Sequence, residues 1–356
     1  MNSKCIVFVI FTLQGNGAER VVLTLASSMR RLGYNTHIVL FKNHIDFQID
    51  PNLPIHFFPY HKFRVLPRAI RPYFASKAFD KFVYNLVGKP NLILSNLEPV
   101  DRVLTNSKLD NIHFVIHNTL SNEFSSDLKR LNKTLKIYTK KSCISVSKGV
   151  HDDLISLLPK NKNMEVIYNP IDIDFIKSSS EAVQTIPHKH RDYIINVGGF
   201  KPQKRQDILL KAFAKSNIKE NLMFIGKGPL LDATRQLSIE LGIADRVIFA
   251  GFKSNPFPFI KHAKALVSSS DFEGLGMTIL EAISLGVPVI STNCPSGPSE
   301  ILPPLNLSPV GDIEELAKNI KNVVKCPNKY LVKLKKDFLL EASINSYFSL
   351  LGKEHP

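Results

Sequence analysis

Residues 271–281, DFEGLGMTILE, place two carboxylates, Glu273 and Glu281, eight positions apart around a Gly-Leu-Gly turn. The preceding residues 263–270, AKALVSSS, predict a short apolar strand, and residues 277–286, MTILEAISLG, have apolar side chains at helical spacing. The stretch is therefore expected to run from a strand through a glycine turn into a helix, which is the repeating unit of an α/β fold.

The start of this helix has the chemistry of an anion site. Its first backbone N–H groups, on Leu275, Gly276 and Met277, have no partner within a helix and favour a diphosphate or another anion. Glu281, about two turns further along, is a candidate acceptor for vicinal ribose hydroxyls. A plainer alternative makes Glu273 a loop acid near a helix start and Glu281 a solvated helix residue, and the segment alone does not separate the two.

Two other segments repeat the pattern of strand, turn and helix. Residues 197–214, VGGFKPQKRQDILLKAFA, give a buried strand, a glycine turn and an amphipathic helix, with Lys204 at the helix start, where it can face phosphate. Residues 224–252 give a strand, a Gly-x-Gly-Pro turn, a helix and a further strand. This repetition favours a parallel sheet flanked by helices.

The order and spacing of these segments resemble the retaining glycosyltransferases of carbohydrate-enzyme family four, which have the GT-B fold. The resemblance covers most of the chain and is specific in its C-terminal half. It implies that Glu273 and Glu281 form the family's Glu-x7-Glu pair, in which the first carboxylate contacts the donor sugar and the second the ribose. It also implies that Lys204 binds the donor diphosphate.

The chain departs from this family pattern at Gly199, where the family usually has an arginine five positions before the lysine. Arginine is a bidentate phosphate ligand, whereas glycine has no side chain to offer. The donor phosphates are therefore expected to be bound by Lys204 and helix N-termini, with Lys201 and Arg205 as further candidates.

The first 33 residues contain another strand, glycine loop and helix. In the family, a Gly-Gly-Ala-Glu loop at this place lies near the donor phosphate and the acceptor, and Gly17, Ala18 and Glu19 match its last three members. Asn16 replaces a glycine. Because Gly-x-Gly by itself also describes an ordinary turn, Gly17 is a donor-site candidate only through its place in the chain.

His117 follows an alternating apolar run, NIHFVIHNTL at residues 111–120, and so lies at the carboxyl end of a predicted strand, where open α/β sheets place ligands. Asn118 is equally well placed. The resemblance implies that His117 touches the donor sugar or stabilises charge near the reacting carbon. The alternative is a structural or surface histidine, and it is preferred for His113.

The length of 356 residues exceeds what one core usually supports, so two domains are expected. The pattern weakens after residue 175, which predicts an N-terminal domain at 1–170 and a C-terminal domain at 171–334. A helical segment at about 335–356 is expected, from the resemblance, to pack back onto the N-terminal domain. The predicted fold class is α/β, with two Rossmann-like domains whose parallel sheets face a central cleft.

The charge is concentrated in the N-terminal half. Residues 1–170 hold 23 Lys and Arg against 12 Asp and Glu, which is +11 of the total +15. Residues 61–89 combine seven basic residues with aromatic ones, and residues 128–141 add six more. Either segment could be a solvated helix face, but together they favour an anionic bilayer or a lipid-linked acceptor. No nucleic-acid-binding signature accompanies them.

Four scattered cysteines without metal spacing fit a reducing cytoplasm, and no apolar run approaches the length of a membrane helix. Asp172 and Asp174 match the Asp-x-Asp metal motif of another glycosyltransferase fold, but they lie in the expected linker, which argues against a metal. Gly297, Pro298 and Glu300 resemble a family segment near the cleft. Glu300 could bind a hydroxyl, although a helix cap is the favoured role.

The sequence thus predicts a retaining transfer of sugar from a nucleotide diphosphate sugar, most simply a UDP-sugar, to a saccharide or lipid-linked acceptor. The expected setting is a bacterial surface glycan such as lipopolysaccharide or capsule, on the cytoplasmic face of the membrane. Charge stabilisation by Lys204 and a helix start needs no metal or other cofactor. A GT-B nucleotide-sugar epimerase, a phosphorylase and a non-catalytic scaffold remain alternatives.

Overall fold

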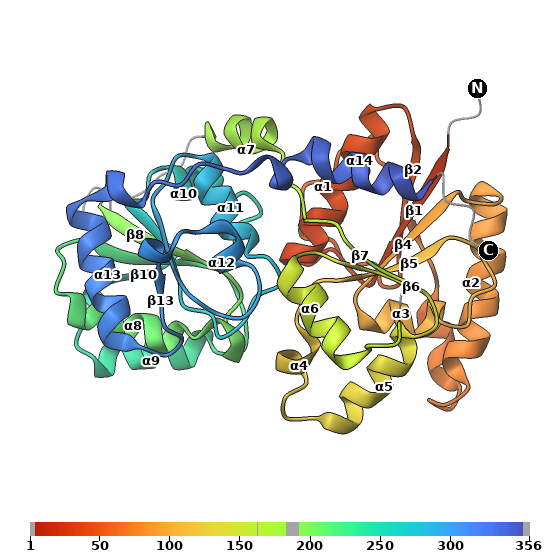
Figure 1. Cartoon of the computed structure of the whole chain (residues 1–356), viewed down its shortest axis with the longest axis horizontal. Coiled ribbons are helices and arrows are strands. Elements are labelled where there is room, and N and C mark those ends of the chain that lie inside the picture. The colour runs from red at the N-terminus through yellow and green to blue at the C-terminus, as the bar shows by residue number, and fades with distance from the viewer. Residues whose placement is uncertain (1–3, 162, 183–191, 352–356) are drawn as a thin grey trace. The chain divides into compact units, whose positions relative to one another are not determined.

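The computed structural model describes residues 4–161, 163–182 and 192–351, which divide into two compact units (Figure 1). The N-terminal unit runs to Pro170 and also includes the segment that begins at Leu340, and the C-terminal unit spans Ile171–Leu339. Each unit is built on one parallel sheet, so the predicted fold class of two Rossmann-like α/β domains is confirmed.

The N-terminal sheet has seven strands in the order β3-β2-β1-β4-β5-β6-β7. All residues of β1, β4 and β5 are buried, as expected for central parallel strands covered on both faces. The strands are β1 (Cys5–Ile10), β2 (Asn35–Leu40), β3 (Ile55–Phe57), β4 (Leu92–Asn96), β5 (Ile112–Ile116), β6 (Ser142–Ser145) and β7 (Met164–Val166). The helices are α1 (Gly17–Arg31), α2 (Arg71–Val87), α3 (Glu98–Leu104), α4 (Leu120–Glu123), α5 (Leu128–Tyr138), α6 (Lys148–Leu157) and α14 (Leu340–Leu350), with a 3-10 helix at Tyr60–Val65.

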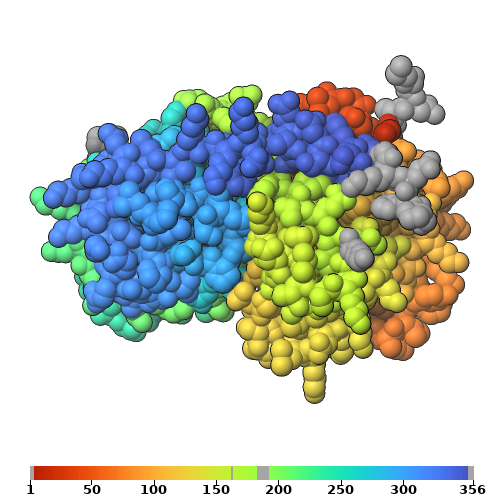
Figure 2. All heavy atoms as spheres, viewed as in Figure 1, coloured from red at the N-terminus to blue at the C-terminus, as the bar shows by residue number. Residues whose placement is uncertain are grey.

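Helix α14 returns to the N-terminal unit from the far end of the chain. The rings of Tyr34 and Phe348 stack with centroids 4.2 Å apart, and Ser343 Oγ donates to the Tyr168 carbonyl at 2.6 Å. Figure 2 shows the dark-blue α14 segment lying against the red segment that contains α1. The expected return at about residue 335 begins later, because Lys336–Phe338 form a 3-10 turn within the C-terminal unit.

The C-terminal sheet has six strands in the order β10-β9-β8-β11-β12-β13. The strands are β8 (Tyr193–Val197), β9 (Asn221–Ile225), β10 (Val247–Phe249), β11 (Ala265–Ser268), β12 (Val289–Thr292) and β13 (Leu307–Ser308). The helices are α7 (Ile173–Ser180), α8 (Gln206–Ser216), α9 (Leu231–Glu240), α10 (Phe257–Lys261), α11 (Met277–Ser284), α12 (Pro298–Ile301) and α13 (Ile313–Lys325). Helices α8 and α13 pack together, and Leu209, Phe213 and Ile320 are fully buried there.

The strand order of the C-terminal sheet reverses between β8 and β11. The chain runs from β8 through β9 to β10 on one side and then places β11 on the other side of β8. Loops that leave neighbouring strands in opposite directions open a crevice at the carboxyl ends of those strands, which is where open α/β sheets bind ligands. Residues 198–205 follow β8 and residues 269–276 follow β11, so both lie at this switch point.

The turn after β9 is pressed against the turn after β8. A Cβ atom on Gly226 would lie 1.9 Å from the Gly198 carbonyl oxygen, and one on Gly228 would lie 2.5 Å from the Phe200 carbonyl oxygen. No side chain fits in such gaps, so the Gly-x-Gly-Pro turn is a packing requirement. This packing fixes the position of the backbone of the turn after β8 beside the switch point.

Candidate functional site

The two loops of the C-terminal switch point bring Lys204 and Glu273 together. Lys204 ends the 3-10 turn Pro202–Lys204, and its Nζ lies 2.6 Å from Glu273 Oε1. The same carboxylate oxygen accepts a hydrogen bond from Ser270 Oγ at 2.7 Å. Glu273 is 8% exposed, and this contact between residues 69 positions apart was not deducible from the sequence.

Backbone contacts tie the same two loops together. Asp271 N donates to the Gln203 carbonyl at 2.8 Å, and Gln203 Nε2 donates to the Phe272 carbonyl at 2.7 Å. Ser269 Oγ donates to the carbonyl of Lys204 at 2.9 Å. The ammonium and the carboxylate are therefore held by a network rather than by their own pairing alone, which lowers the entropic cost of ordering them.

Arg205 supports this network from a strained position. Its backbone is left-handed, with φ 45° and ψ 47°, which is unfavourable for a residue other than glycine. Its guanidinium contacts both oxygens of Asp271, at 3.0 and 3.2 Å, and both oxygens of Asp207, at 3.0 and 3.2 Å. Arg205 is thus engaged by two carboxylates, a role that its place in a basic loop did not indicate.

The start of α11 is shaped by the segment that precedes α12. Gly276 adopts a left-handed φ of 89° as the N-cap residue and contributes no side-chain cap to the helix N-terminus. A Cβ atom on Gly297 would lie 2.3 Å from the Leu275 carbonyl oxygen, and Ser296 Oγ donates to the Gly274 carbonyl at 2.6 Å. These contacts hold the turn so that the first N–H groups of α11, including that of Met277, point out of the helix as anion donors.

Glu300 and Asp172 are helix caps in the structure. The Gly297 N–H donates to Glu300 Oε1 at 3.4 Å, in the capping role that the sequence favoured. Asp172 accepts from the Phe175 N–H at 3.0 Å at the start of α7. Both carboxylates are accounted for by local backbone chemistry.

Glu281 is a buried carboxylate. It is the fifth residue of α11, little more than one turn into the helix, and only 3% of it is exposed. Two turns were expected, but at 3.6 residues per turn the four steps from Met277 to Glu281 span little more than one. The alternative of a solvated surface glutamate is wrong, because a carboxylate is kept out of water in this way only where it has a structural or ligand-binding use.

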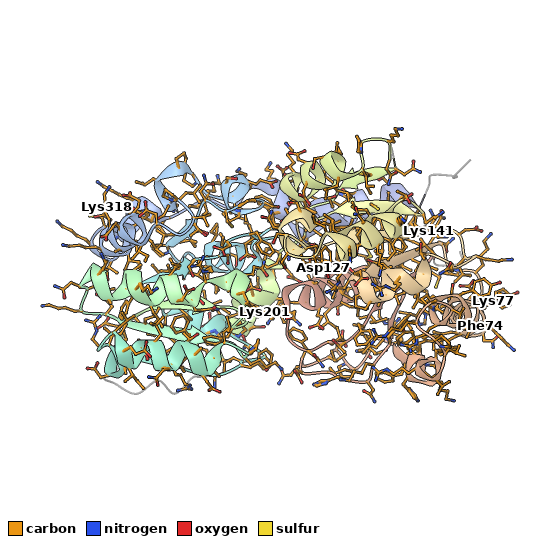
Figure 3. The ribbon with its side chains drawn as sticks, turned by 90° about the horizontal axis from the view of Figure 1, so that it is seen from below. Phe74, Lys77, Asp127, Lys141, Lys201 and Lys318 are labelled. Atoms are coloured by element: carbon orange, nitrogen blue, oxygen red, sulfur yellow. The ribbon has the colours of Figure 1, made fainter. Side chains whose placement is uncertain are left out.

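A pocket of about 510 Å³ opens beside Arg205 and Asp271 within the C-terminal unit. One wall is polar and is formed by the turn after β8, the start of α8 and the loop after β11, and the other is largely apolar and is formed by α9 and Leu230 just before it. Lys201, which Figure 3 labels, is one of the residues that line it. Its lining residues are Lys201, Pro202, Arg205, Gln206, Asp207, Leu230, Ala233, Thr234, Leu237 and Asp271.

In the N-terminal unit, Gly17 is the first residue of α1 and is exposed after the turn that follows β1. Asn16 and Glu19 form a capping box, in which Glu19 Oε2 accepts from the Asn16 N–H at 2.8 Å. Its other oxygen accepts from Thr12 Oγ1 at 2.8 Å. Glu19 is therefore a structural residue of the loop, and Gly17 presents the N-terminus of a helix of 15 residues.

His117 follows β5 and contacts Asn96 at the end of β4. Asn96 donates its amide hydrogens to the carbonyls of Val9 and Leu94, so its Oδ1, 2.9 Å from His117 Nε2, accepts the imidazole proton. Burial lowers the pKa of His117 from 6.5 to about 4, which keeps the ring neutral near pH 7. Within the part of the chain that the structure describes, His117 Nδ1 and Asn118 Oδ1 are shielded acceptors without a hydrogen-bond partner.

The predicted site residues thus fall into two groups. Lys204, Glu273, Glu281 and the first residues of α11 lie in the C-terminal unit, where the structure joins Lys204 to Glu273 directly. Gly17 and His117 lie in the N-terminal unit. Asn96 was missed by sequence reasoning, although its place at the carboxyl end of a buried strand is a signal that could have found it.

The two basic segments differ in structure. Residues 61–89 form a 3-10 helix followed by α2, which buries Phe79 and Val83 and exposes Tyr73, Phe74 and Tyr84 by 46–65%. Figure 3 shows Phe74 and Lys77 close together on this helix. Residues 128–138 form α5, whose exposed face is basic. Of the helices in residues 4–161, 163–182 and 192–351, none has both the length and the hydropathy needed to cross a membrane.

Comparison with known proteins gives two family matches. The model described as "Glycosyltransferase Family 4" matches residues 15–175, and the model described as "Glycosyl transferases group 1" matches residues 178–337. Together they account for most of both units.

Curated relatives and solved structures agree with these matches. The chain is 27% identical over 311 residues to an N-acetylgalactosamine-N,N'-diacetylbacillosaminyl-diphospho-undecaprenol 4-alpha-N-acetylgalactosaminyltransferase of Campylobacter jejuni, covering 82% of this chain and 81% of that one. It is 32% identical over 199 residues to a lipopolysaccharide 1,6-galactosyltransferase of Salmonella typhimurium, covering 52% and 53%. The structure of Anabaena HepE with UDP and glucose superimposes with a TM-score of 0.80, at 18% identity, over 98% of this chain and 99% of that one.

Proposed function

The chain belongs to the GT-B glycosyltransferases, with a family 4 domain followed by a group 1 domain, and from that premise we propose that it transfers a sugar, with retention, from a nucleotide diphosphate sugar. The observation that carries the proposal is the Lys204–Glu273 pair at the switch point of the C-terminal sheet. A cation, a carboxylate and a helix N-terminus occur there within two short loops, which suits a diphosphate joined to a sugar.

Each residue has a distinct role in the proposed reaction. Lys204 and the first N–H groups of α11 stabilise the negative charge that develops on the leaving diphosphate. Glu273 accepts hydrogen bonds from donor-sugar hydroxyls, and Glu281 accepts those of the ribose. His117, neutral and protonated on Nε2, offers Nδ1 as an acceptor to a sugar hydroxyl. Gly17 presents the α1 N-terminus to the phosphates.

The proposed transfer follows a front-face path. The bond between the anomeric carbon and the β-phosphate oxygen breaks, and the acceptor oxygen bonds to the same face of the sugar. The acceptor proton passes to the departing phosphate oxygen, so the nucleoside diphosphate leaves and the configuration is retained. No metal or other cofactor takes part in the proposed reaction, because the cation, the helix N-terminus and the leaving group supply the charge stabilisation and the base.

The proposed donor is a UDP-linked hexose or N-acetylhexosamine, and the proposed acceptor is a saccharide or a lipid-linked glycan of a bacterial surface polymer. Anabaena HepE, which shares the fold, was solved with UDP and glucose, and the Campylobacter and Salmonella relatives are named for lipid-linked and lipopolysaccharide acceptors. We place the enzyme at the cytoplasmic face of the membrane, with α2 and α5 on anionic lipid.

A donor panel followed by product analysis tests the function. Thermal stabilisation by UDP-sugars and GDP-sugars identifies the nucleotide, because a ligand that binds only the folded state raises the melting temperature. The chosen donor is then incubated with saccharide and lipid-linked acceptors, and the new linkage is read by NMR. An inverted anomeric centre would exclude the front-face path, and stabilisation by no donor would count against the enzyme function itself.

A further inference from the structure

The turn after β8 carries three cations, Lys201, Lys204 and Arg205, together with Gly199. A diphosphate carries more negative charge than one ammonium group neutralises. If the proposed function holds, on which this inference rests, a second cation must therefore contact the donor phosphates. The three side chains differ in the groups that they contact.

Arg205 is committed to protein carboxylates. Its guanidinium contacts both oxygens of Asp207 and both oxygens of Asp271, all at 3.0–3.2 Å. Binding a phosphate would require it to leave two bidentate partners and the loop that they anchor. The geometry makes Arg205 a positioning residue, which holds the loop of Asp271 and Glu273.

Lys204 and Lys201 lie over the two glycines that end β8. The stem of Lys204 packs on Gly198, where a Cβ atom would meet its Cε at 3.7 Å, and its Nζ reaches Glu273. The stem of Lys201 crosses Gly199, where a Cβ atom would meet its Cε at 3.3 Å and its Cγ at 3.7 Å. Lys201 thus takes the space into which a side chain at position 199 would extend.

Gly199 favours this arrangement through the space it leaves for Lys201 rather than through its backbone conformation. Its φ lies outside the left-handed region, so the backbone would accept other residues. Lys201 is exposed and lines the pocket together with Arg205 and Asp271. A Cβ atom at position 199 would lie 3.3 Å from Lys201 Cε, so a side chain there would push the lysine away from its observed path.

We propose that Lys201, laid across Gly199, is the second cation of the donor diphosphate site and replaces a side chain at position 199. Lys204 and Lys201 then reach the phosphates from adjacent glycines. A lysine binds phosphate as a compact point charge without the fixed fork of a guanidinium. The site is therefore expected to depend steeply on salt and to tolerate movement of the diphosphate between bound states.

The test is a reciprocal exchange of the cation between the two positions. The dissociation constants of UDP, GDP and uridine are measured by calorimetry for the full-length wild type, Lys201→Ala, Gly199→Arg and the double variant Gly199→Arg/Lys201→Ala. Lys201→Ala is expected to weaken binding of the nucleoside diphosphate about 10-fold and to leave uridine unchanged. The double variant is expected to regain most of that loss, whereas Gly199→Arg alone gains little because Lys201 is displaced.

Lys264→Ala is the matched control. Lys264 is a lysine of the same unit that precedes β11, and its Nζ pairs with Asp192 at 3.3 Å, so it lies at the amino end of the strands. Equal affinities for Lys201→Ala, Lys264→Ala and wild type would overturn the inference while leaving the donor site intact. A loss that the double variant does not restore would also overturn the exchange. A wild type that binds neither UDP nor GDP would overturn the proposed function and this inference with it.

Discussion

Lys204 Nζ and Glu273 Oε1 are 2.6 Å apart, so two of the groups proposed to contact the donor neutralise each other across the switch point of the C-terminal sheet. Both side chains are mostly shielded, with 24% and 10% exposed. A charge pair in such surroundings interacts more strongly than one in water. An incoming diphosphate must therefore compete with Glu273 for the ammonium of Lys204.

This competition predicts opposite effects of one substitution on binding and on turnover. Glu273→Gln is expected to tighten UDP binding about 2–10-fold, because Lys204 no longer has an anionic partner, and to lower kcat by roughly 100-fold through loss of the sugar contact. Calorimetry measures the affinity for UDP, and steady-state kinetics measure kcat. Glu240→Gln, on the exposed end of α9, is the control. Weaker UDP binding in Glu273→Gln would contradict the proposed competition.

Glu281 is predicted to distinguish ribose from deoxyribose. A hydrogen bond to a buried carboxylate contributes about 1.5–3 kcal/mol, which corresponds to roughly 10–100-fold in affinity. Wild type should therefore bind UDP more tightly than 2′-deoxy-UDP by that factor, and Glu281→Gln should reduce the ratio. The ratio is compared by calorimetry, which cancels any general effect of the substitution on the fold. An unchanged ratio would rule out a ribose contact.

His117 is predicted to make the fold sensitive to acid. Its pKa is about 4 in the folded chain, lowered from 6.5 by burial, so the unfolded chain binds the proton more readily. The free energy of unfolding should therefore fall as the pH is lowered from 6.5 towards 4 and should be unaffected by this group above pH 6.5. Urea denaturation at pH 7, 5.5 and 4.5 measures the fall.

In His117→Gln the acid-induced fall should be smaller, because glutamine does not titrate and its amide can still donate to Asn96. His37, whose pKa is also lowered to about 4 by burial and by the neighbouring His56 and Arg30, retains its own share of the fall in that variant. An identical pH dependence in wild type and His117→Gln would show that His117 titrates normally.

Arg205 is predicted to matter more for turnover than for stability. Arg205→Gly removes the ion pairs with Asp207 and Asp271 but also relieves a left-handed backbone worth about 1 kcal/mol, so stability should change by less than about 1 kcal/mol. Turnover should fall roughly 10-fold, because the loop of Glu273 loses an anchor. Asn217, at the other end of α8, is also left-handed with φ 49°, so Asn217→Gly controls for backbone relief. Comparable kcat values in both variants would refute the positioning role.

Helix α2 is predicted to bind anionic bilayers by charge and by aromatic insertion. Phe74→Ser/Tyr84→Ser should weaken flotation with phosphatidylglycerol vesicles in both low and high salt, because the two rings are exposed and stabilise the fold little. Lys77→Glu/Lys81→Glu should weaken it about 10-fold or more in low salt only. Lys211→Glu, on α8, is the charge control. Equal flotation of the wild type with phosphatidylcholine and with phosphatidylglycerol vesicles would argue against binding to an anionic surface.

The sequence predicted the fold because each strand and helix carries its own period and the glycine turns separate them. It also placed Lys204 and Glu273 after their strands. It could not predict that they touch, because that depends on β8 and β11 being neighbours, and strand order is set by the packing of the whole sheet. The burial of Glu281 likewise depends on the segment that packs over α11.

Two local features show what a sequence pattern can and cannot predict. The Asn16-Gly-Ala-Glu19 stretch carries the signature of a capping box, so the structural role of Glu19 was readable from the sequence. The left-handed conformation of Arg205 was not readable, because propensity alone assigns that conformation to glycine or asparagine. It is stabilised by contacts with Asp207, two residues further along, and with Asp271, 66 residues away.

The return of α14 has a consequence for synthesis of the protein. The N-terminal unit is discontinuous in sequence, and Phe348 stacks on Tyr34 only after the whole C-terminal unit has left the ribosome. The surface of α1 that receives α14 is therefore exposed during translation of about 170 intervening residues, whereas the C-terminal unit can fold as soon as it emerges. Completion of the first unit therefore waits until the C-terminal unit has been synthesised, and until then the face of α1 that packs against α14 stays uncovered.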